Sequence, residues 1–320
     1  MMAWRDNLSS SEWDTQLAKM GGHPLQSALW GDARIKFEGI IDQRLALYDK
    51  ENIVALVRAE MRGLKLLFTL IWIPQGPALS PDVDCHLIYK KISDKLKKNA
   101  NVVCATYPWA VKNTEGMGSR KTIWIDLKKG KEKLWADLDS QWRYGVRRAE
   151  REGAIAYIAQ DEQELEVFYH LCQQVSQNKK FQFNVSIDFM RFLLKNGNDS
   201  GVSAKLFVTK YQNDIAAGAL ILKVGKHIHY MWGAVDRRYS KVRVGEFIQW
   251  AVINWACDQG CERYDLEGID ENANPGTAAF KKKMGGEEIV FPSADVVNIG
   301  FRGKIIASFI KKKLGVVEAI

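Results

Sequence analysis

The residues best suited to chemistry lie in the last third of the chain, at 264–286. Asp265 and Glu267 close a predicted strand, and a loop rich in Gly, Asn and Pro leads to Phe280 and Lys281, just before Met-Gly-Gly. A fixed ammonium stabilises negative charge that develops on oxygen in a transition state, and strand-end carboxylates can act as general acids or bases. The alternative interpretation is a surface lysine in the run 281–283 and two acids that cap a loop.

Two other pairs of residues are of types that can bind a metal ion. His227 and His229 share one face of a predicted strand, and Cys257 and Cys261 are four residues apart near a predicted helix end. The cysteines have no His or Cys partner pair nearby in the sequence to complete a ligand set, so small buried side chains are the favoured interpretation. For the histidines the favoured interpretation is packing or solvent exposure, and we expect no metal. The sequence also lacks a serine-hydrolase elbow, a Walker loop and a dinucleotide fingerprint.

Composition limits the class of protein. With 320 residues, 47% hydrophobic and 26% charged, the chain is long enough for two folded domains. The net charge of +8 favours anionic partners such as RNA, nucleotide-linked substrates or acidic lipid surfaces, although a basic protein without such a role fits equally. Five scattered cysteines and an N-terminus without an apolar signal core predict a cytoplasmic protein. The most apolar run, 64–73, is too short to cross a bilayer as a helix.

Periodicity predicts the same order of elements in both halves. In the first half, strands at 53–59 and 64–73, with a turn at 61–63, precede a helix that opens at Ser80 and a strand at 102–106. In the second half, the predicted elements are strands at 205–211, 215–224 and 227–235, a helix at 244–259 and a strand at 263–267. Two copies of an N-acyltransferase module of the GNAT type would give this order. The predicted fold class is therefore α/β (α+β), with mixed twisted sheets.

A basic helix is predicted between the two halves, at 131–152. Apolar residues form one helical stripe, while Arg143, Arg147 and Arg151 fall at i, i+4 and i+8 on another face, with Arg148 beside them. Spacing alone favours a solvated face on a packed helix. The alternative is a surface that follows the phosphates of tRNA, because guanidinium groups in a line can pair with successive anions.

The C-terminal segment 302–314 is also amphipathic, with lysines crowded on one side and at the end. We expect a helix that docks on the protein. The alternative is peripheral contact with an anionic membrane surface, which here would be the inner face of the cell membrane.

Several separated motifs together resemble the Fem-type peptidoglycan-bridge aminoacyltransferases. The motifs are His-Pro-Leu-Gln-Ser at 23–27, Ile-Pro-Gln-Gly-Pro at 73–77, the basic segment 143–153, Tyr-Met-Trp-Gly-Ala at 230–234, Tyr-Asp-Leu-Glu-Gly at 264–268, and 280–285. Their order and spacing from Pro24 to Gly286 together carry the resemblance.

The resemblance implies two tandem GNAT-like (acyl-CoA N-acyltransferase) domains. The first would comprise 1–125 plus 294–320, with the C-terminal helix packing back, and the second 126–293. The donor would be aminoacyl-tRNA and the acceptor a nucleotide-linked or lipid-linked muropeptide precursor, with an amide formed on the stem-peptide amine and no cofactor. This chain looks like the compact form of the family, without a coiled-coil arm.

The resemblance also assigns residues. Lys281, after Phe280, matches the lysine that steadies the donor ester and the developing oxyanion. Arg34, or alternatively Lys36, lies where relatives place a substrate-binding cation. Tyr230 and Trp232 fall in the acceptor-contact motif, where Trp232 replaces a frequent Tyr and offers stacking without a hydroxyl. At 107–108, Tyr-Pro replaces a common Asp-Pro, so proton removal would fall to the substrate or water, with Asp265 and Glu267 as other candidates.

Two alternative functions remain open at this point. An acyl-CoA-dependent N-acyltransferase acting on a cell-surface sugar or peptide amine would normally hold pyrophosphate on a glycine-rich turn before a helix. The equivalent turn here has one glycine, Gly245, and would depend on the side chains of Arg238, Lys241 and Arg243. The third function is a non-enzymatic protein that binds RNA or a membrane surface.

Overall fold

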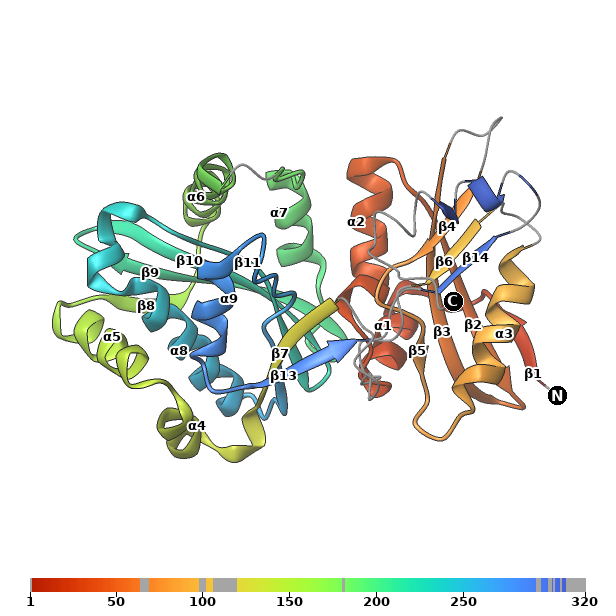
Figure 1. The fold of residues 1–320 in the computed structure, drawn as a ribbon, viewed down its shortest axis with the longest axis horizontal. Helices are drawn as coiled ribbons and strands as arrows, with labels where there is room; N and C mark the ends of the chain where they lie inside the picture. Colours follow the sequence, from red (N-terminus) through yellow and green to blue (C-terminus); the bar gives the residue numbers. More distant parts are fainter. Residues whose placement is uncertain are drawn as a thin grey trace. The chain divides into compact units, whose positions relative to one another are not determined.

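The computed structural model describes residues 2–63, 69–97, 102–105, 120–179, 182–291 and 295–298, together with 301, 303–305 and 307–308 (Figure 1). The chain forms two compact units. The first comprises Met1–Arg120, Ser200–Val202 and Val290–Ile320, and the second comprises Lys121–Asp199 and Ser203–Ile289. No helix in the described part has both the length and the apolar character needed to span a membrane.

The first unit is built on a mixed sheet. Its strands in spatial order are β1 (Met2–Arg5), β2 (Ile41–Asp49), β3 (Asn52–Arg62), β4 (Leu70–Ile73), β6 (Val102–Ala105) and β14 (Asp295–Asn298), and β5 (Ala78–Leu79) also pairs with β3. The pairs are antiparallel except β4 and β6, which are parallel. Helix α3 (Cys85–Leu96) makes the crossover between those two strands.

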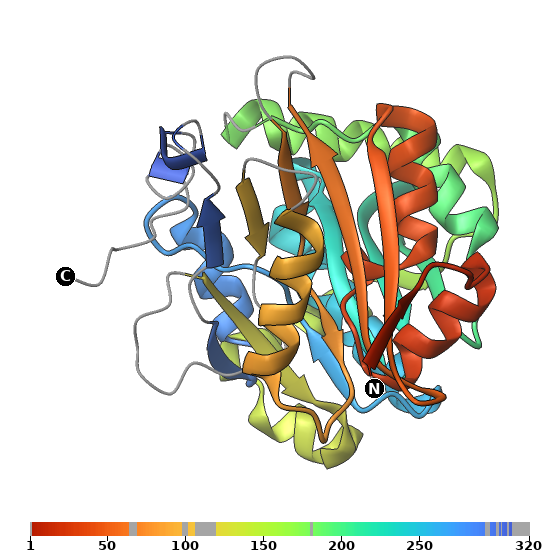
Figure 2. The ribbon, with the colours of Figure 1, turned by 90° about the vertical axis from the view of Figure 1, so that its right-hand side faces the viewer.

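Helices cover both faces of the first sheet (Figure 2). The alternation of side chains along β3 decides what each face contains. Ala55, Val57 and Ala59 pack with the apolar side of α3 in one core. Arg58 and Glu60 point to the other face, where α1 (Ser10–Lys19), the short η1 (Pro24–Gln26) and α2 (Ala28–Glu38) lie. That second face is therefore held by ion pairs as well as by apolar contacts.

The second unit contains the other mixed sheet. Its strands in spatial order are β13 (Glu287–Phe291), β7 (Arg120–Asp126), β12 (Arg263–Asp265), β11 (His227–Val235), β10 (Asp214–Val224), β9 (Val202–Tyr211) and β8 (Ile155–Ile158). Its helices are η3 (Leu127–Lys129), α4 (Lys131–Asp137), α5 (Ser140–Arg151), α6 (Glu162–Lys179), α7 (Ile187–Asn196), η4 (Arg237–Val242), α8 (Val244–Asp258) and α9 (Pro275–Lys282). Figure 1 shows α6 and α7 on one side of this sheet and α5 and α8 on the other.

The two units repeat one topology. In each, three consecutive strands lie side by side, and the third is antiparallel to the second. A helix then crosses over, and a fourth strand pairs parallel with the third. The series β2-β3-β4-α3-β6 in the first unit corresponds to β9-β10-β11-α8-β12 in the second. The predicted α/β class with mixed sheets in two similar units is therefore confirmed.

Several predicted boundaries were wrong for local reasons. Helix α3 begins at Cys85 rather than near Ser80, because the Asp84 side chain accepts the first helical amides, those of His86 and Leu87. The predicted helix at 131–152 is two helices, since Leu138 is extended and Asp139 caps a new helix at Ser140. Strand β3 continues through the predicted turn to Arg62, because it pairs with β4.

Candidate functional site

A gap in strand pairing creates a chamber in the second unit. Strands β11 and β12 pair over three rows, from His227–Arg263 to His229–Asp265, and β11 then continues to Val235. Beyond the paired rows lies a chamber of about 310 Å³. Tyr230, Gly233 and Ala234 line it from β11, α8 contributes Gly245, and α9 contributes Phe280. The chamber lies where the two parallel strands stop pairing, so backbone and side chains from several elements converge on it.

Lys281 lies beside the chamber, and its side chain is almost completely buried. It is 7% exposed, and its Nζ donates to the backbone carbonyls of Gly268 at 2.9 Å and Glu267 at 3.3 Å. Burial lowers the pKa of Lys281 to about 8, against the opposing effect of the Glu267 and Asp265 carboxylates. The interpretation of Lys281 as a solvated surface lysine is thus wrong. Its neighbour Lys282 takes that role and pairs with Glu271 and Glu288.

Aromatic rings form the walls of the chamber. The ring of Tyr230 lies 5.7 Å from the Lys281 Nζ, and Phe280 packs on Trp142 with ring centroids 5.0 Å apart. Burial raises the pKa of the Tyr230 hydroxyl. A Cβ built on Gly233 would lie 1.6 Å from the Tyr230 hydroxyl oxygen, so the tyrosine occupies this position because residue 233 has no side chain.

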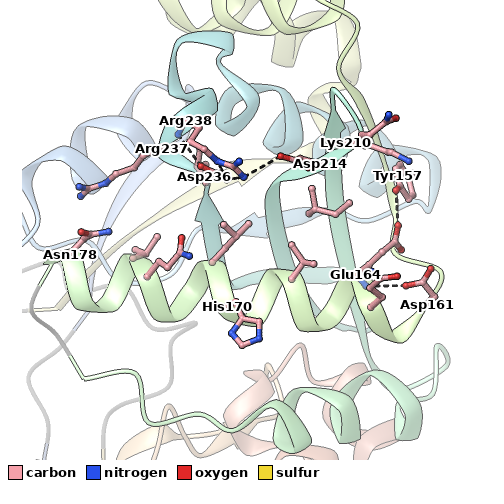
Figure 3. Close-up of a pocket in the computed structure, with 18 residues that line it drawn as sticks. Tyr157, Asp161, Glu164, His170, Asn178, Lys210, Asp214, Asp236, Arg237 and Arg238 are labelled. Carbon is pink, nitrogen blue, oxygen red and sulfur yellow. Dashed lines mark hydrogen bonds and ion pairs between the residues drawn. The ribbon is translucent and has the colours of Figure 1, made fainter.

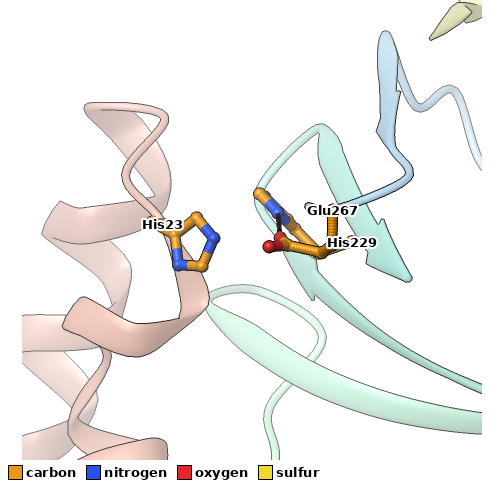
Figure 4. A group of neighbouring side chains, drawn as sticks. All are labelled: His23, His229 and Glu267. Atoms are coloured by element: carbon orange, nitrogen blue, oxygen red, sulfur yellow. Dashed lines mark hydrogen bonds and ion pairs between the residues drawn. The ribbon is translucent and has the colours of Figure 1, made fainter. Parts of the chain in front are cut away.

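The two strand-end acids have different environments. Asp265 is 2% exposed and accepts hydrogen bonds from the Thr122 hydroxyl, the Trp124 indole and the Glu267 amide. This last contact turns the chain, so β12 ends at Asp265 rather than at the predicted 267, and Glu267 has a φ of 59°. The Glu267 carboxylate lies 2.8 Å from Nδ1 of His229 (Figure 4). Asp265 therefore holds the strand end in place, whereas Glu267 carries the more accessible carboxylate.

A second, larger cavity adjoins the chamber. It has a volume of about 810 Å³ and lies between α6 and the ends of β9, β10 and β11 (Figure 3). Val175, Val235 and Arg237 line both spaces, which makes the two cavities neighbours in one unit. At the far end of the larger cavity the Tyr157 hydroxyl donates to Glu164, with Lys210 nearby (Figure 3).

The cations of the turn before α8 are not equivalent. Arg238 pairs with Asp236 at 2.6 Å and Asp214 at 3.2 Å, and Arg243 pairs with Glu246 at 2.9 Å. Lys241 is exposed and lines neither cavity. Arg237, which sequence reasoning missed, lines both. Its position two residues past the end of β11 was the only signal available, and that signal does not separate it from Arg238.

The predicted basic helix uses most of its arginines internally. Arg143 donates to the carbonyls of Ala136 and Leu138, which end α4, and Arg147 stacks over Trp135 at 5.4 Å. Arg148 pairs with Glu152 at 2.7 Å. For Arg151 the described residues provide no ion pair, so it remains the exposed candidate for a phosphate contact.

The predicted cations of the first unit also have partners there. Arg34 pairs with Glu38 and, at 3.2 Å, with Glu60, and Lys36 lies over the Phe37 ring at 5.4 Å. Glu60 in turn contacts Arg58, which is completely buried. Arg34 therefore belongs to a network of ion pairs in this unit.

Other predicted residues lie elsewhere. Trp232 is outside the residues that line the chamber and contacts Phe189 of α7 edge-on, with ring centroids 6.5 Å apart. The Tyr-Pro pair at 107–108, the strand residues 64–68 and most of the predicted C-terminal helix lie outside the described residues.

Comparisons with known proteins agree with this geometry. The sequence model of the acetyltransferase (GNAT) domain family matches residues 137–282, the segment that builds the chamber. A lipid II:glycine glycyltransferase from Staphylococcus saprophyticus is 31% identical over 74 residues, which are 22% of this chain and 18% of that protein. The crystal structure of FemX superposes with a TM-score of 0.78 at 15% identity, over 97% of this chain and 100% of that one.

Residues 137–282 thus match the acetyltransferase (GNAT) domain family, and the fold of the chain is similar to that of FemX. Residues 137–282 are accordingly an acyltransferase domain. Two further structures have the same fold at lower similarity. L-PGS from Bacillus licheniformis gives a TM-score of 0.57 at 13% identity, over 94% of this chain and 96% of that one. A tandem GNAT protein from the clavulanic acid biosynthesis pathway gives 0.54 at 10% identity, over 93% and 98%.

Proposed function

We propose that this protein is a Fem-type, non-ribosomal aminoacyltransferase that moves an amino acid from aminoacyl-tRNA to the stem-peptide amine of a peptidoglycan precursor. The observation that carries the proposal is the buried ammonium of Lys281, fixed by two carbonyls beside a small chamber. The glycyltransferase relative acts on lipid II by its name, which favours a lipid-linked acceptor over a nucleotide-linked one. Such an acceptor would bring the protein to the inner membrane surface.

The chemistry of the site suits ester aminolysis. The acceptor amine attacks the ester carbonyl of the donor, a C–N bond forms, and negative charge develops on the carbonyl oxygen. The Lys281 ammonium stabilises that charge. The surroundings of the ammonium are of low polarity, which strengthens the electrostatic interaction. The C–O bond to the ribose then breaks, and one amine proton leaves with the ribose oxygen. All groups in this scheme come from the two substrates and the chain, so we propose that no cofactor takes part.

The rigid position of Lys281 matters to this role. Two backbone carbonyls and the Tyr230 ring hold the ammonium before substrate binds, so little reorganisation is needed during reaction. Phe280, the preceding residue, lines the chamber itself and can exclude water from the reacting ester.

The test is transfer of label from charged tRNA. Purified protein is incubated with labelled aminoacyl-tRNA mixtures and lipid-linked or nucleotide-linked muropeptide precursors. Lys281→Ala is compared with Lys282→Ala, which removes the same charge from the adjacent, exposed position. We expect transfer by the wild type and Lys282→Ala, and a loss of about 10²–10³-fold in kcat for Lys281→Ala. Equal rates for the two variants would contradict the role of Lys281.

The second candidate is an acyl-CoA-dependent N-acyltransferase. It is favoured by Gly245, at the start of α8, which lines the chamber and exposes the helix N-terminus to it. Labelled acetyl-CoA in a parallel incubation separates the two candidates. Label that moves from acetyl-CoA and not from tRNA would replace the first proposal with the second.

A further inference from the structure

Arg237 has a position that no other cation of the second unit shares among the described residues. It begins η4, two residues after the end of β11, and lines both the 310 Å³ chamber and the 810 Å³ cavity. Its side chain is exposed, and none of the described residues forms an ion pair or a side-chain hydrogen bond with it. Figure 3 shows Arg237 and Asn178 at the same end of the larger cavity. A guanidinium at such a junction is available to a ligand that occupies both spaces.

The neighbouring charges are already satisfied. Asp236 and Asp214 are held by Arg238, and Asp214 also accepts from the Tyr239 hydroxyl at 2.6 Å. Glu164 accepts from the Tyr157 hydroxyl and from the Gln160 amide, both at 2.6 Å. Asp161, at the far end, accepts from the Glu164 amide at 2.9 Å. The cavity has a cation at each end, Arg237 beside Asn178 and Lys210 beside Tyr157.

Three amide side chains of α6 line the larger cavity, Gln163 near the start of the helix and Gln174 and Asn178 toward its end. Gln174 and Asn178 are four residues apart on α6, so they lie one helical turn apart on the same face. Each amide offers both a donor and an acceptor, the combination that reads the edge of a nucleobase. The cavity volume falls within the range of sites that enclose small ligands.

We infer that Arg237 binds the phosphate of the donor's terminal nucleotide and that the 810 Å³ cavity holds the nucleoside, with Gln174 and Asn178 on the base. This inference rests on the proposed function, because it takes aminoacyl-tRNA as the donor. The terminal ribose then lies at the junction, and its aminoacyl ester extends into the chamber beside Lys281. A bidentate guanidinium–phosphate contact suits arginine at this position better than lysine.

The experiment measures binding of adenosine 5′-monophosphate to the full chain by titration, with inorganic phosphate and coenzyme A as comparison ligands. Arg237→Ala and Asn178→Ala are the test variants, and Arg237→Lys is the conservative one. Lys226→Ala is the matched control, because Lys226 is an exposed cation at the opposite end of β11 and lines neither cavity. We expect at least a tenfold weaker nucleotide affinity in Arg237→Ala, partial recovery in Arg237→Lys, and no change in Lys226→Ala.

Kinetics with charged tRNA add a second measurement. Arg237→Ala should raise the donor KM with little change in kcat, and the slope of log affinity against log salt should fall by about 0.7–0.9, the value for one lost phosphate contact. Arg237→Ala matching Lys226→Ala in both assays, or no nucleotide binding by the wild type, would overturn the inference.

The two proposals fail separately. If Arg237→Ala transfers the amino acid from tRNA as well as the wild type, the proposed function is supported and the nucleotide site is contradicted. If nucleotide binding depends on Arg237 but no amino acid is transferred from tRNA, the nucleotide site is supported and the proposed function is contradicted. Arg237-dependent binding of coenzyme A alone would overturn the assignment of the cavity to an RNA terminus.

Discussion

The Nζ of Lys281 lies 5.7 Å from the centre of the Tyr230 ring, while its hydrogen bonds go to the carbonyls of Glu267 and Gly268. The ammonium is thus fixed between the end of β12 and a wall of the chamber. An aromatic face attracts a cation without removing its protons. The Lys281 ammonium is therefore largely removed from water but can still donate a hydrogen bond to a bound substrate.

The pH dependence of transfer follows from this position. Burial lowers the pKa of Lys281 to about 8. If the ammonium is the active form, kcat is full below pH 8 and falls as pH rises through that value. Lys281→Arg, whose side chain stays protonated, should lose this alkaline limb at a reduced overall rate. The measurement is a kcat profile from pH 6 to about 10. A limb that persists in Lys281→Arg would assign it to another group.

Gly233 is expected to control the position of Tyr230. In Gly233→Ala the new Cβ would collide with the Tyr230 hydroxyl, so the ring must move and the chamber changes shape. We expect a loss of about tenfold or more in kcat/KM, with the fold retained. A double-mutant cycle with Tyr230→Ala checks the cause. Gly233→Ala should cost little more in that background, and full additivity would show that the two residues act independently.

Arg58 should be essential to the stability of the first unit. Its guanidinium is completely buried and pairs with Asp42 and Glu60, both at 2.8 Å. Arg58→Met leaves two buried carboxylates without this partner and should lower the free energy of unfolding by about 3–5 kcal/mol. Arg5→Met is the control, since its pair with Glu51 is exposed and should contribute less than about 1 kcal/mol. Urea denaturation compares the two.

The ion pairs of Glu60 predict an acid response. Arg58, Arg34 and Arg62 hold the pKa of Glu60 at about 2, against the desolvation that would raise it. Because this pKa is below that of an unfolded glutamate, the contribution of Glu60 is present above about pH 4.5 and is lost as pH falls toward 2. Glu60→Gln should flatten this part of the stability profile. An unchanged profile between pH 5 and 2 would show that other carboxylates dominate.

The arginines of α5 should separate into structural and exposed groups. Arg143→Ala removes donors from two carbonyls at the end of α4 and should lower stability by about 1–3 kcal/mol. Arg151→Ala should leave stability within about 0.5 kcal/mol. Thermal denaturation tests this difference. If Arg151→Ala also leaves tRNA affinity unchanged, Arg151 does not contribute to tRNA binding.

Sequence periodicity predicted part of the order of the elements, chiefly the strands and the helix from 205 to 267. The strand predicted at 227–235 is β11, and the helix predicted from Val244 is α8, because apolar spacing and end signals are local properties. Boundaries were wrong where a single side chain decides them. Asp139 divides one predicted helix in two, and Asp265 ends β12 by accepting the Glu267 amide.

The sequence by itself determined the strand, helix and strand order at the centre of each half, the Phe280–Lys281 pair and its resemblance to a family. Tertiary structure decided which cations remain available, because ion pairing joins residues distant in the chain. Arg238 is held by Asp214, 24 residues away, and Arg34 by Glu60, whereas Arg237 faces two cavities. Burial likewise distinguishes Lys281 from Lys282, two neighbours in one run of lysines, since solvent exposure depends on what the rest of the fold places around each side chain.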